Sequence, residues 1–200
     1  MTKPAVLIVP GLRDHAAQHW QTLLAAELPR VRCVPPMGRE RLDCAARVEA
    51  IEREAQAIEG PLVVVAHSAG TIMVAHWARR TTRRVLGALL ATPPDFERPM
   101  PEGYPTLDAL REGGWLPVPR GPLPFASIVA ASRNDPLAEY GRVARLANDW
   151  GSSLVDLGEV GHLNPASGFG SWQRAHEFID RIAATRQAAS DALPTQPLPN

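Results

Sequence analysis

The stretch Val63–Gly70, VVVAHSAG, places a serine hydroxyl among small residues directly after an apolar run. A strand that turns sharply into a helix around such a serine is the setting of a nucleophile elbow, whose usual pattern is G-x-S-x-G. Ala66 stands where the pattern has its first glycine, and Gly70 fills the second position. One extra methyl group is compatible with such a turn. The alternative is that Ser68 only caps the helix, because serine is a favoured N-cap residue.

A nucleophilic serine needs two partners, because its hydroxyl is weak until a base takes the proton and an acid orients that base. On an elbow fold the chain order is serine, then an acid, then histidine, each after a later strand. Asp135 follows the apolar run 125–131, and His162 lies between glycines after the run 152–157. Taken singly, Asp135 indicates a helix cap and His162 a surface loop. The three together, in this order, favour a Ser68–His162–Asp135 triad.

Two other carboxylates, Asp156 and Glu159, also lie near the ends of late strands. Glu159 is only three residues from His162 and would reach it from solvent. Asp135 comes one strand earlier, and the strand ends of such a fold bring that loop beside the histidine loop. We therefore expect Asp135 to be the acid.

The remaining histidines fit the role of base less well. His67 precedes the serine on the elbow and cannot easily turn back onto its hydroxyl, so we expect it to line the substrate pocket instead. The others lie on the first turn or on predicted helices: His15, His19, His76 and His176. None has metal-ligand spacing with a carboxylate, so we expect no metal and no cofactor.

Two backbone N–H groups are expected to stabilise a developing oxyanion. Ala69 would begin the helix after the elbow, where helix N–H groups are unpaired. Leu12 is the second candidate, in the loop VPGLRDH, where Gly11 allows a close approach. Arg13 is a candidate residue of the pocket mouth, and the alternative is that it forms a solvated charge pair with Asp14.

Alternating strands and helices must position these residues. Continuous apolar runs predict strands at 5–10, 30–34, 61–66, 85–91, 125–131 and 152–157, and helical periodicity predicts helices at 15–28, 43–59, 69–80, 137–150 and 171–187. Asp43 is a candidate cap of the second helix. Runs that do not alternate with polar residues are typical of a mostly parallel sheet covered by helices on both faces. We expect one α/β domain over residues 1–187 and a flexible tail over 188–200.

The stretch from Thr92 to Pro124 interrupts this alternation with nine prolines. It is long for a structureless connection, and such loops are often lids or binding loops. Its apolar side chains are candidates to line an acyl or leaving-group pocket, Trp115 above all: Phe96, Tyr104, Trp115 and Leu116. The equal alternative is that they pack the loop onto the sheet.

The composition limits the possible partners. Lys and Arg together number 21, as do Asp and Glu, so the chain has no net charge to attract nucleic acid or an anionic membrane. Cys33 and Cys44 have the spacing of ordinary thiols in a reducing compartment. No signal segment and no apolar run of about 20 residues is present, so we expect a cytoplasmic protein. The sequence does not indicate an oligomeric state.

The chain resembles the small serine hydrolases of the RBBP9/YdeN family in the α/β-hydrolase superfamily. The resemblance rests on five segments, roughly from Ala5 to Ile182: VLIVPGL, HWQ, VVVAHSAG, SRNDP and GHLNPASGFGSW. It implies a compact sheet without a large inserted cap domain, and a triad of Ser68, Asp135 and His162. It does not fix a substrate.

These observations predict a serine hydrolase that cleaves a small carboxylic ester or amide through an acyl-enzyme. A binding protein on the same scaffold is an alternative, because a fold does not prove its chemistry. A lyase or a haloperoxidase-like activity on the same triad is a third possibility. The segment LDCAA begins like the L-x-C-x-E motif but has Ala46 in place of the glutamate, so that partner is not supported.

Overall fold

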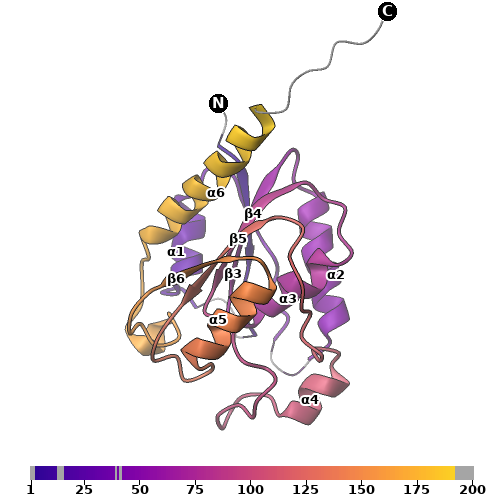
Figure 1. Cartoon of the computed structure of the whole chain (residues 1–200), viewed down its shortest axis with the longest axis vertical. Helices are drawn as coiled ribbons and strands as arrows, with labels where there is room; N and C mark the ends of the chain where they lie inside the picture. Colours follow the sequence, from indigo (N-terminus) through magenta and orange to yellow (C-terminus); the bar gives the residue numbers. More distant parts are fainter. Residues whose placement is uncertain (1–2, 13–15, 39, 41, 192–200) are drawn as a thin grey trace, which may run out of the picture.

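A computed structural model describes residues 3–12, 16–38, 40 and 42–191, which form one α/β domain around a six-stranded sheet (Figure 1). All the strand pairs are parallel, in the order β2-β1-β3-β4-β5-β6. The strands are β1 (Ala5–Val9), β2 (Val31–Cys33), β3 (Leu62–His67), β4 (Val85–Ala91), β5 (Ala126–Ala131) and β6 (Ser153–Asp156). The helices are α1 (Trp20–Glu27), α2 (Cys44–Gln56), α3 (Ala69–Ala78), α4 (Leu107–Glu112), α5 (Tyr140–Asp149), the 3-10 turn η1 (Pro165–Ser167) and α6 (Arg174–Asp191).

Helices cover both faces of the sheet, which confirms the fold class predicted from the apolar runs (Figure 1). Leu7 and Val64 point to the face covered by α2, α3 and α5. Their strand neighbours Ile8 and Val63 point to the opposite face, covered by α1 and α6. Successive side chains of a strand point to opposite faces, so a strand buried on both sides is apolar at every position.

Local capping decides where two of the helices begin. The Asp43 carboxylate accepts the N–H of Ala46 at 3.0 Å and caps α2, as expected. The first helix begins only at Trp20, later than the periodicity predicted. His19 is extended there, and its Nδ1 accepts the N–H of Gln21 at 3.2 Å. At the other end of the chain α6 runs to Asp191, beyond the expected domain end at residue 187. Residues 192–200 of the expected tail lie outside the described residues.

The proline-rich excursion, Thr92–Pro124, crosses the carboxyl edge of the sheet and contains only the short helix α4 (Figure 1). Indole N–H groups bind it to the domain at two points. Trp115 donates to the carbonyl of Leu42 at 2.6 Å, and Trp150 donates to the carbonyl of Pro119 at 2.9 Å. The described residues therefore contain no inserted cap domain over the sheet.

In the described part of the chain, no helix has both the length and the apolar character to cross a membrane.

Candidate active site

Ser68 stands at the sharp turn between β3 and α3. Its φ of 55° and ψ of −132° are strained for a residue with a side chain. The turn packs so closely that a Cβ on Gly70 would lie 2.5 Å from the Val9 carbonyl oxygen and 2.7 Å from that of Pro10. Ala66 is fully buried in β3, and its methyl group is accommodated. The side chain of Ser68 makes no capping hydrogen bond, so capping does not account for the hydroxyl.

The hydroxyl is instead the first member of a hydrogen-bonded series. Ser68 Oγ lies 2.8 Å from Nε2 of His162. The Nδ1 of the same ring lies 2.9 Å and 3.0 Å from the two carboxylate oxygens of Asp135. The side chains of His162 and Asp135 are only 6% and 2% exposed. A carboxylate in this position keeps the proton on Nδ1, which leaves the Nε2 lone pair facing the serine hydroxyl.

The two rival carboxylates are engaged elsewhere or exposed. Asp156 binds the guanidinium of Arg133 at 2.6 Å and 2.8 Å. These hydrogen bonds hold the pKa of Asp156 below its usual range. Glu159 is exposed to solvent. Among the described carboxylates, Asp135 is the one that hydrogen-bonds with His162.

Side chains from two loops fix the backbone on either side of the imidazole. The N–H of His162 donates to Ser167 Oγ at 3.1 Å, and that hydroxyl donates to Asn164 Oδ1 at 3.1 Å. The preceding N–H, of Gly161, donates to Asn134 Oδ1 in the loop after β5 at 2.7 Å. Gly161 has a φ of +57°, and a Cβ there would collide with the Ser167 side chain. The loops after β5 and β6 are therefore joined where they carry the acid and the base.

His67 supports the same loop from the sheet side. Its Nε2 lies 2.9 Å from the carbonyl oxygen of His162, and a carbonyl only accepts, so Nε2 carries the proton. Its ring centre lies 4.8 Å from that of His19 and 5.0 Å from that of His162. Burial lowers the pKa of His67 well below its usual 6.5, and the neighbouring histidines lower it further. His67 is thus a neutral ring under the loop and also lines the cavity described below.

Two segments that carry the family resemblance meet near this site. The amide of Gln21 donates to the carbonyl oxygens of Val9 at 3.2 Å and Val65 at 3.1 Å, which connects α1 to the ends of β1 and β3. The ring of Trp20 packs edge-on against that of Trp172, with the ring centres 4.9 Å apart. The HWQ segment and the GFGSW segment thereby support the elbow from one side of the sheet.

The two proposed oxyanion donors both border the cavity at Ser68. Ala69 is the first residue of α3, where an N–H has no acceptor within the helix. The loop that carries Leu12 passes directly against the serine, because a Cβ on Gly11 would lie 3.1 Å from Ser68 Cβ. The sequence predicted this close contact between the loop and the serine, because Gly11 has no side chain. Arg13 lies outside the described residues.

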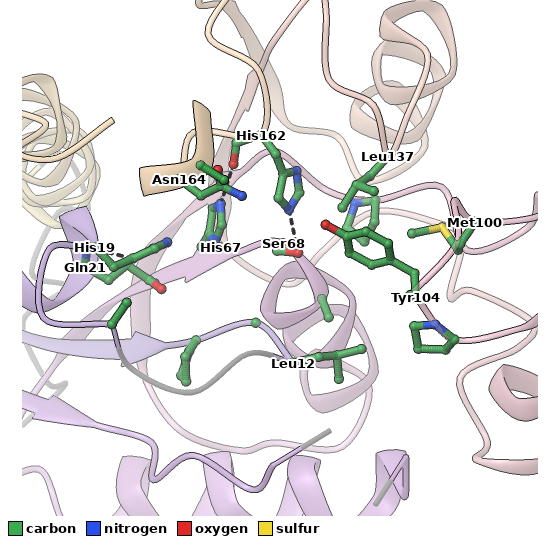
Figure 2. A pocket seen from close by; sticks show the side chains of 18 of the residues that line it. Leu12, His19, Gln21, His67, Ser68, Met100, Tyr104, Leu137, His162 and Asn164 are labelled. Atoms are coloured by element: carbon green, nitrogen blue, oxygen red, sulfur yellow. Dashed lines mark hydrogen bonds between the residues drawn. The ribbon is translucent and has the colours of Figure 1, made fainter. Parts of the chain in front are cut away.

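A cavity of about 430 Å³ opens beside Ser68 and His162 (Figure 2). This volume is within the range of roughly 300–1,000 Å³ that is typical of small-molecule sites. Its described lining contains no Asp, Glu, Lys or Arg. The lining residues are Pro10, Gly11, Leu12, Ala16, His19, Gln21, Leu42, His67, Ser68, Ala69, Pro94, Phe96, Met100, Gly103, Tyr104, Pro105, Leu137, His162, Asn164, Pro165 and Ala166.

Trp115 does not line this cavity, although the sequence made it a candidate pocket residue. It is fully buried and packs edge-on against Phe96, with the ring centres 5.4 Å apart, while its N–H binds Leu42. Leu116 packs against the core as well. Phe96 and Tyr104 do line the cavity. Met100 and Leu137 also do so, and no pattern in the sequence distinguished them from ordinary apolar loop residues.

The described cysteines and possible metal-ligating side chains are the alternative candidates for reactive groups. Burial raises the pKa of the Cys44 thiol to about 11, so this cysteine stays protonated and unreactive. Burial also raises the pKa of Cys33. No group of three or more histidine, cysteine or acidic side chains in the described ranges has an arrangement that fits a metal ion.

Comparisons with known proteins agree with the fold. Residues 6–181 match the serine hydrolase family. A YdeN-like hydrolase from Pectobacterium atrosepticum is 27% identical, with a TM-score of 0.76 over 93% of this chain and 92% of its own. The ydeN gene product of B. subtilis is 16% identical, with a TM-score of 0.72 over 91% of this chain and 100% of its own. Est1E from Butyrivibrio proteoclasticus, in a structure with bound ferulic acid, is 10% identical, with a TM-score of 0.66 over 94% and 90%.

A search of curated proteins gives no match. The family match nevertheless spans most of the chain, and the similar structures are aligned over nearly their whole lengths. The fold, the elbow and the order of strands agree with this assignment. The chain therefore belongs to the serine hydrolase family, as a YdeN-like member with the α/β-hydrolase fold.

Proposed function

We propose that the protein hydrolyses a small carboxylic ester through an acyl-enzyme, with Ser68 as nucleophile, His162 as general base and acid, and Asp135 as the acid that orients it. The observation that carries the proposal is the hydrogen-bonded series from Ser68 Oγ, at the cavity, through both ring nitrogens of His162 to the buried Asp135, with distances of 2.8 Å and 2.9 Å. Hydrogen bonds of this length are within the reach that proton transfer requires.

The first half of the reaction forms the acyl-enzyme. Ser68 Oγ attacks the ester carbonyl carbon while His162 Nε2 takes the hydroxyl proton. The carbonyl oxygen becomes an oxyanion, to which the N–H groups of Leu12 and Ala69 donate. The carbon–oxygen bond to the alcohol then breaks, and His162 gives its proton to the departing oxygen.

The second half releases the acid. A water molecule takes the place of the alcohol, and His162 removes its proton as the water oxygen attacks the acyl carbon. The bond to Ser68 Oγ breaks, the proton returns to Ser68, and the carboxylic acid leaves. Asp135 stays ionised throughout and stabilises the imidazolium that forms twice.

A binding protein without catalysis would have little need for the strained turn. A residue held in such a backbone conformation costs about 1–3 kcal/mol, and these conformations cluster at active sites. Ser68 adopts one while its hydroxyl faces a buried histidine. Amide hydrolysis uses the same residues, and it requires only that His162 protonate a departing amine.

The test is the turnover of p-nitrophenyl butanoate by the wild type and by Asp135→Asn, with Asp156→Asn and Glu159→Gln as matched controls. We expect Asp135→Asn to lower kcat by about 10⁴, because the amide favours the wrong tautomer of His162. Each control should lose less than about tenfold, since neither carboxylate hydrogen-bonds with the ring. The proposal is contradicted if the folded wild type does not turn over the ester. It is also contradicted if Glu159→Gln loses activity while Asp135→Asn keeps it.

A further inference from the structure

The cavity has two chemically different sides, with Ser68 and His162 between them (Figure 2). His19, Gln21, His67 and Asn164 lie on one side, which we call the polar side. Met100 and Leu137 lie on the other side with the ring of Tyr104, whose hydroxyl oxygen points toward Ser68 and His162; we call this the apolar side (Figure 2). A site with two unlike sides can distinguish the two halves of an ester.

The apolar side is built by the proline-rich excursion together with the loop after β5. The N–H of Asp95 donates to the carbonyl of Leu137 at 3.0 Å, which fixes that loop to the segment leading into Phe96. Phe96 and Leu137 are 2% and 4% exposed and contribute their side chains to the wall. Met100 follows in the same segment. An apolar group placed here gains the free energy of leaving water, in proportion to the area it buries.

The polar side offers both a donor and an acceptor. The amide N–H groups of Gln21 are engaged by the carbonyls of Val9 and Val65, which leaves its Oε1 to accept. The Oδ1 of Asn164 accepts from the N–H and the hydroxyl of Ser167, which leaves its Nδ2 to donate. An acceptor and a donor on one wall suit a ligand with hydroxyl groups, because each hydroxyl both donates and accepts.

The order of bond breaking assigns the halves of the substrate to these sides. The acyl group remains bonded to Ser68 through both steps, whereas the alcohol leaves and water takes its place at His162. The entering water needs hydrogen-bonding groups along its route, and the polar side supplies them in Gln21 and Asn164. The acyl group is better retained where water is excluded, which is the apolar side.

We propose that the substrate is an ester of an uncharged, apolar acyl group with a polar, hydroxyl-bearing alcohol, the acyl group lying against Met100 and Leu137 and the alcohol against Asn164 and Gln21. The proposal rests on the ester hydrolysis proposed above and adds the chemistry of both halves.

The experiment crosses two ester series with three tryptophan variants. The acyl series is the p-nitrophenyl esters of acetic, butanoic and hexanoic acids, and the alcohol series is the butanoate esters of glycerol and of hexanol. Met100→Trp fills the apolar side, and Ala166→Trp narrows the polar side from the turn that carries Asn164. Glu102→Trp is the control, because Glu102 is exposed, belongs to the same segment as Met100 and does not line the cavity.

For the wild type we expect kcat/KM to rise by roughly fourfold for each methylene from acetate to butanoate. Met100→Trp should lower the hexanoate-to-acetate ratio at least tenfold and leave the glycerol-to-hexanol ratio within twofold. Ala166→Trp should lower the glycerol-to-hexanol ratio and leave the acyl ratio within twofold. Glu102→Trp should change neither ratio.

Two results would overturn the inference. If Met100→Trp acts on the alcohol series and Ala166→Trp on the acyl series, the halves are assigned to the wrong sides. If neither variant changes either ratio while the wild type still turns over, the cavity does not hold the substrate in this way. Labelling of Ser68 by a fluorophosphonate in every variant shows that the triad is intact. If the folded wild type shows neither labelling nor turnover, that result contradicts ester hydrolysis itself.

Discussion

The residue that carries most of the proposed chemistry, His162, is held at four points. Asp135 binds its Nδ1, Ser68 faces its Nε2, Ser167 accepts its backbone N–H and His67 donates to its carbonyl. A general base works best when its ring is already in the reactive orientation, because no free energy is then spent on ordering it. His67 takes part in this as a positioning residue, through the backbone and not through the reacting atoms.

The depressed pKa of His67 predicts a pH dependence of stability. As the pH falls below about 6.5, the unfolded chain binds a proton at this histidine while the folded chain does not. The free energy of unfolding therefore falls with decreasing pH, by up to about 1.4 kcal/mol per pH unit, until the folded pKa is reached. The stabilisation is fully present above pH 6.5 and is lost on the acid side.

The measurement is urea unfolding at pH 7.5, 6.5 and 5.5 for the wild type and for His67→Gln. Glutamine cannot titrate, and its amide can still donate to the His162 carbonyl, so the variant should have a shallower slope on the acid side. The pKa of His76 is also lowered by burial, but His76 is present in both proteins and cancels in the comparison. Equal slopes for the two proteins would show that His67 does not titrate as the structure implies.

Among the elements, the junction of β3 with α3 leaves the least room for change. A Cβ on Gly70 would lie 2.5 Å from the Val9 carbonyl oxygen, in the neighbouring β1. We expect Gly70→Ala to destabilise the fold by about 2 kcal/mol or more, because backbone atoms cannot move aside as a flexible side chain can. Gly141→Ala in α5 is the matched control, since nothing lies within 4 Å of its Cβ.

The control change should stabilise the protein by about 0.5–1 kcal/mol through helix propensity and a more restricted unfolded chain. Urea unfolding of both variants and of the wild type measures how much each substitution changes the free energy of unfolding. A Gly70→Ala variant as stable as the wild type would contradict the close packing of the elbow against β1.

The elements were predictable from sequence where burial alone determines the pattern. The apolar runs at 61–66 and 85–91 became β3 and β4, because buried parallel strands are apolar at every position. The start of α1 was not predictable, since His19 satisfies a helix N–H and the helix begins after it. The helix α4 was not predicted from the sequence, because the prolines around it indicate irregular structure. Thr106 nevertheless caps this helix.

In the molecule as a whole, the sequence predicted the candidate triad and part of the cavity wall, Phe96 and Tyr104, but it did not predict Met100 or Leu137 in that wall. Chain order and strand ends are local information, and Ser68, Asp135 and His162 follow from them. The walls depend on how the excursion folds back. The guanidinium of Arg120 lies 2.6 Å from the carboxylate of Glu97 and 2.5 Å from that of Asp149, which connects the excursion to α5. Trp115 is buried in the core. The segment that carries Met100 and Tyr104 is left to border the cavity.

The proposed hydrolysis requires above all that Ser68 is the nucleophile. The direct measurement is titration of the full chain with diisopropyl fluorophosphate, following ester turnover and mapping the adduct by peptide mass spectrometry. We predict that one equivalent abolishes turnover, that the adduct lies on Ser68, and that folded Ser68→Ala takes no adduct and loses about 10⁴–10⁶ in kcat. Full turnover by the labelled protein, or an adduct on any other residue, would contradict the claim.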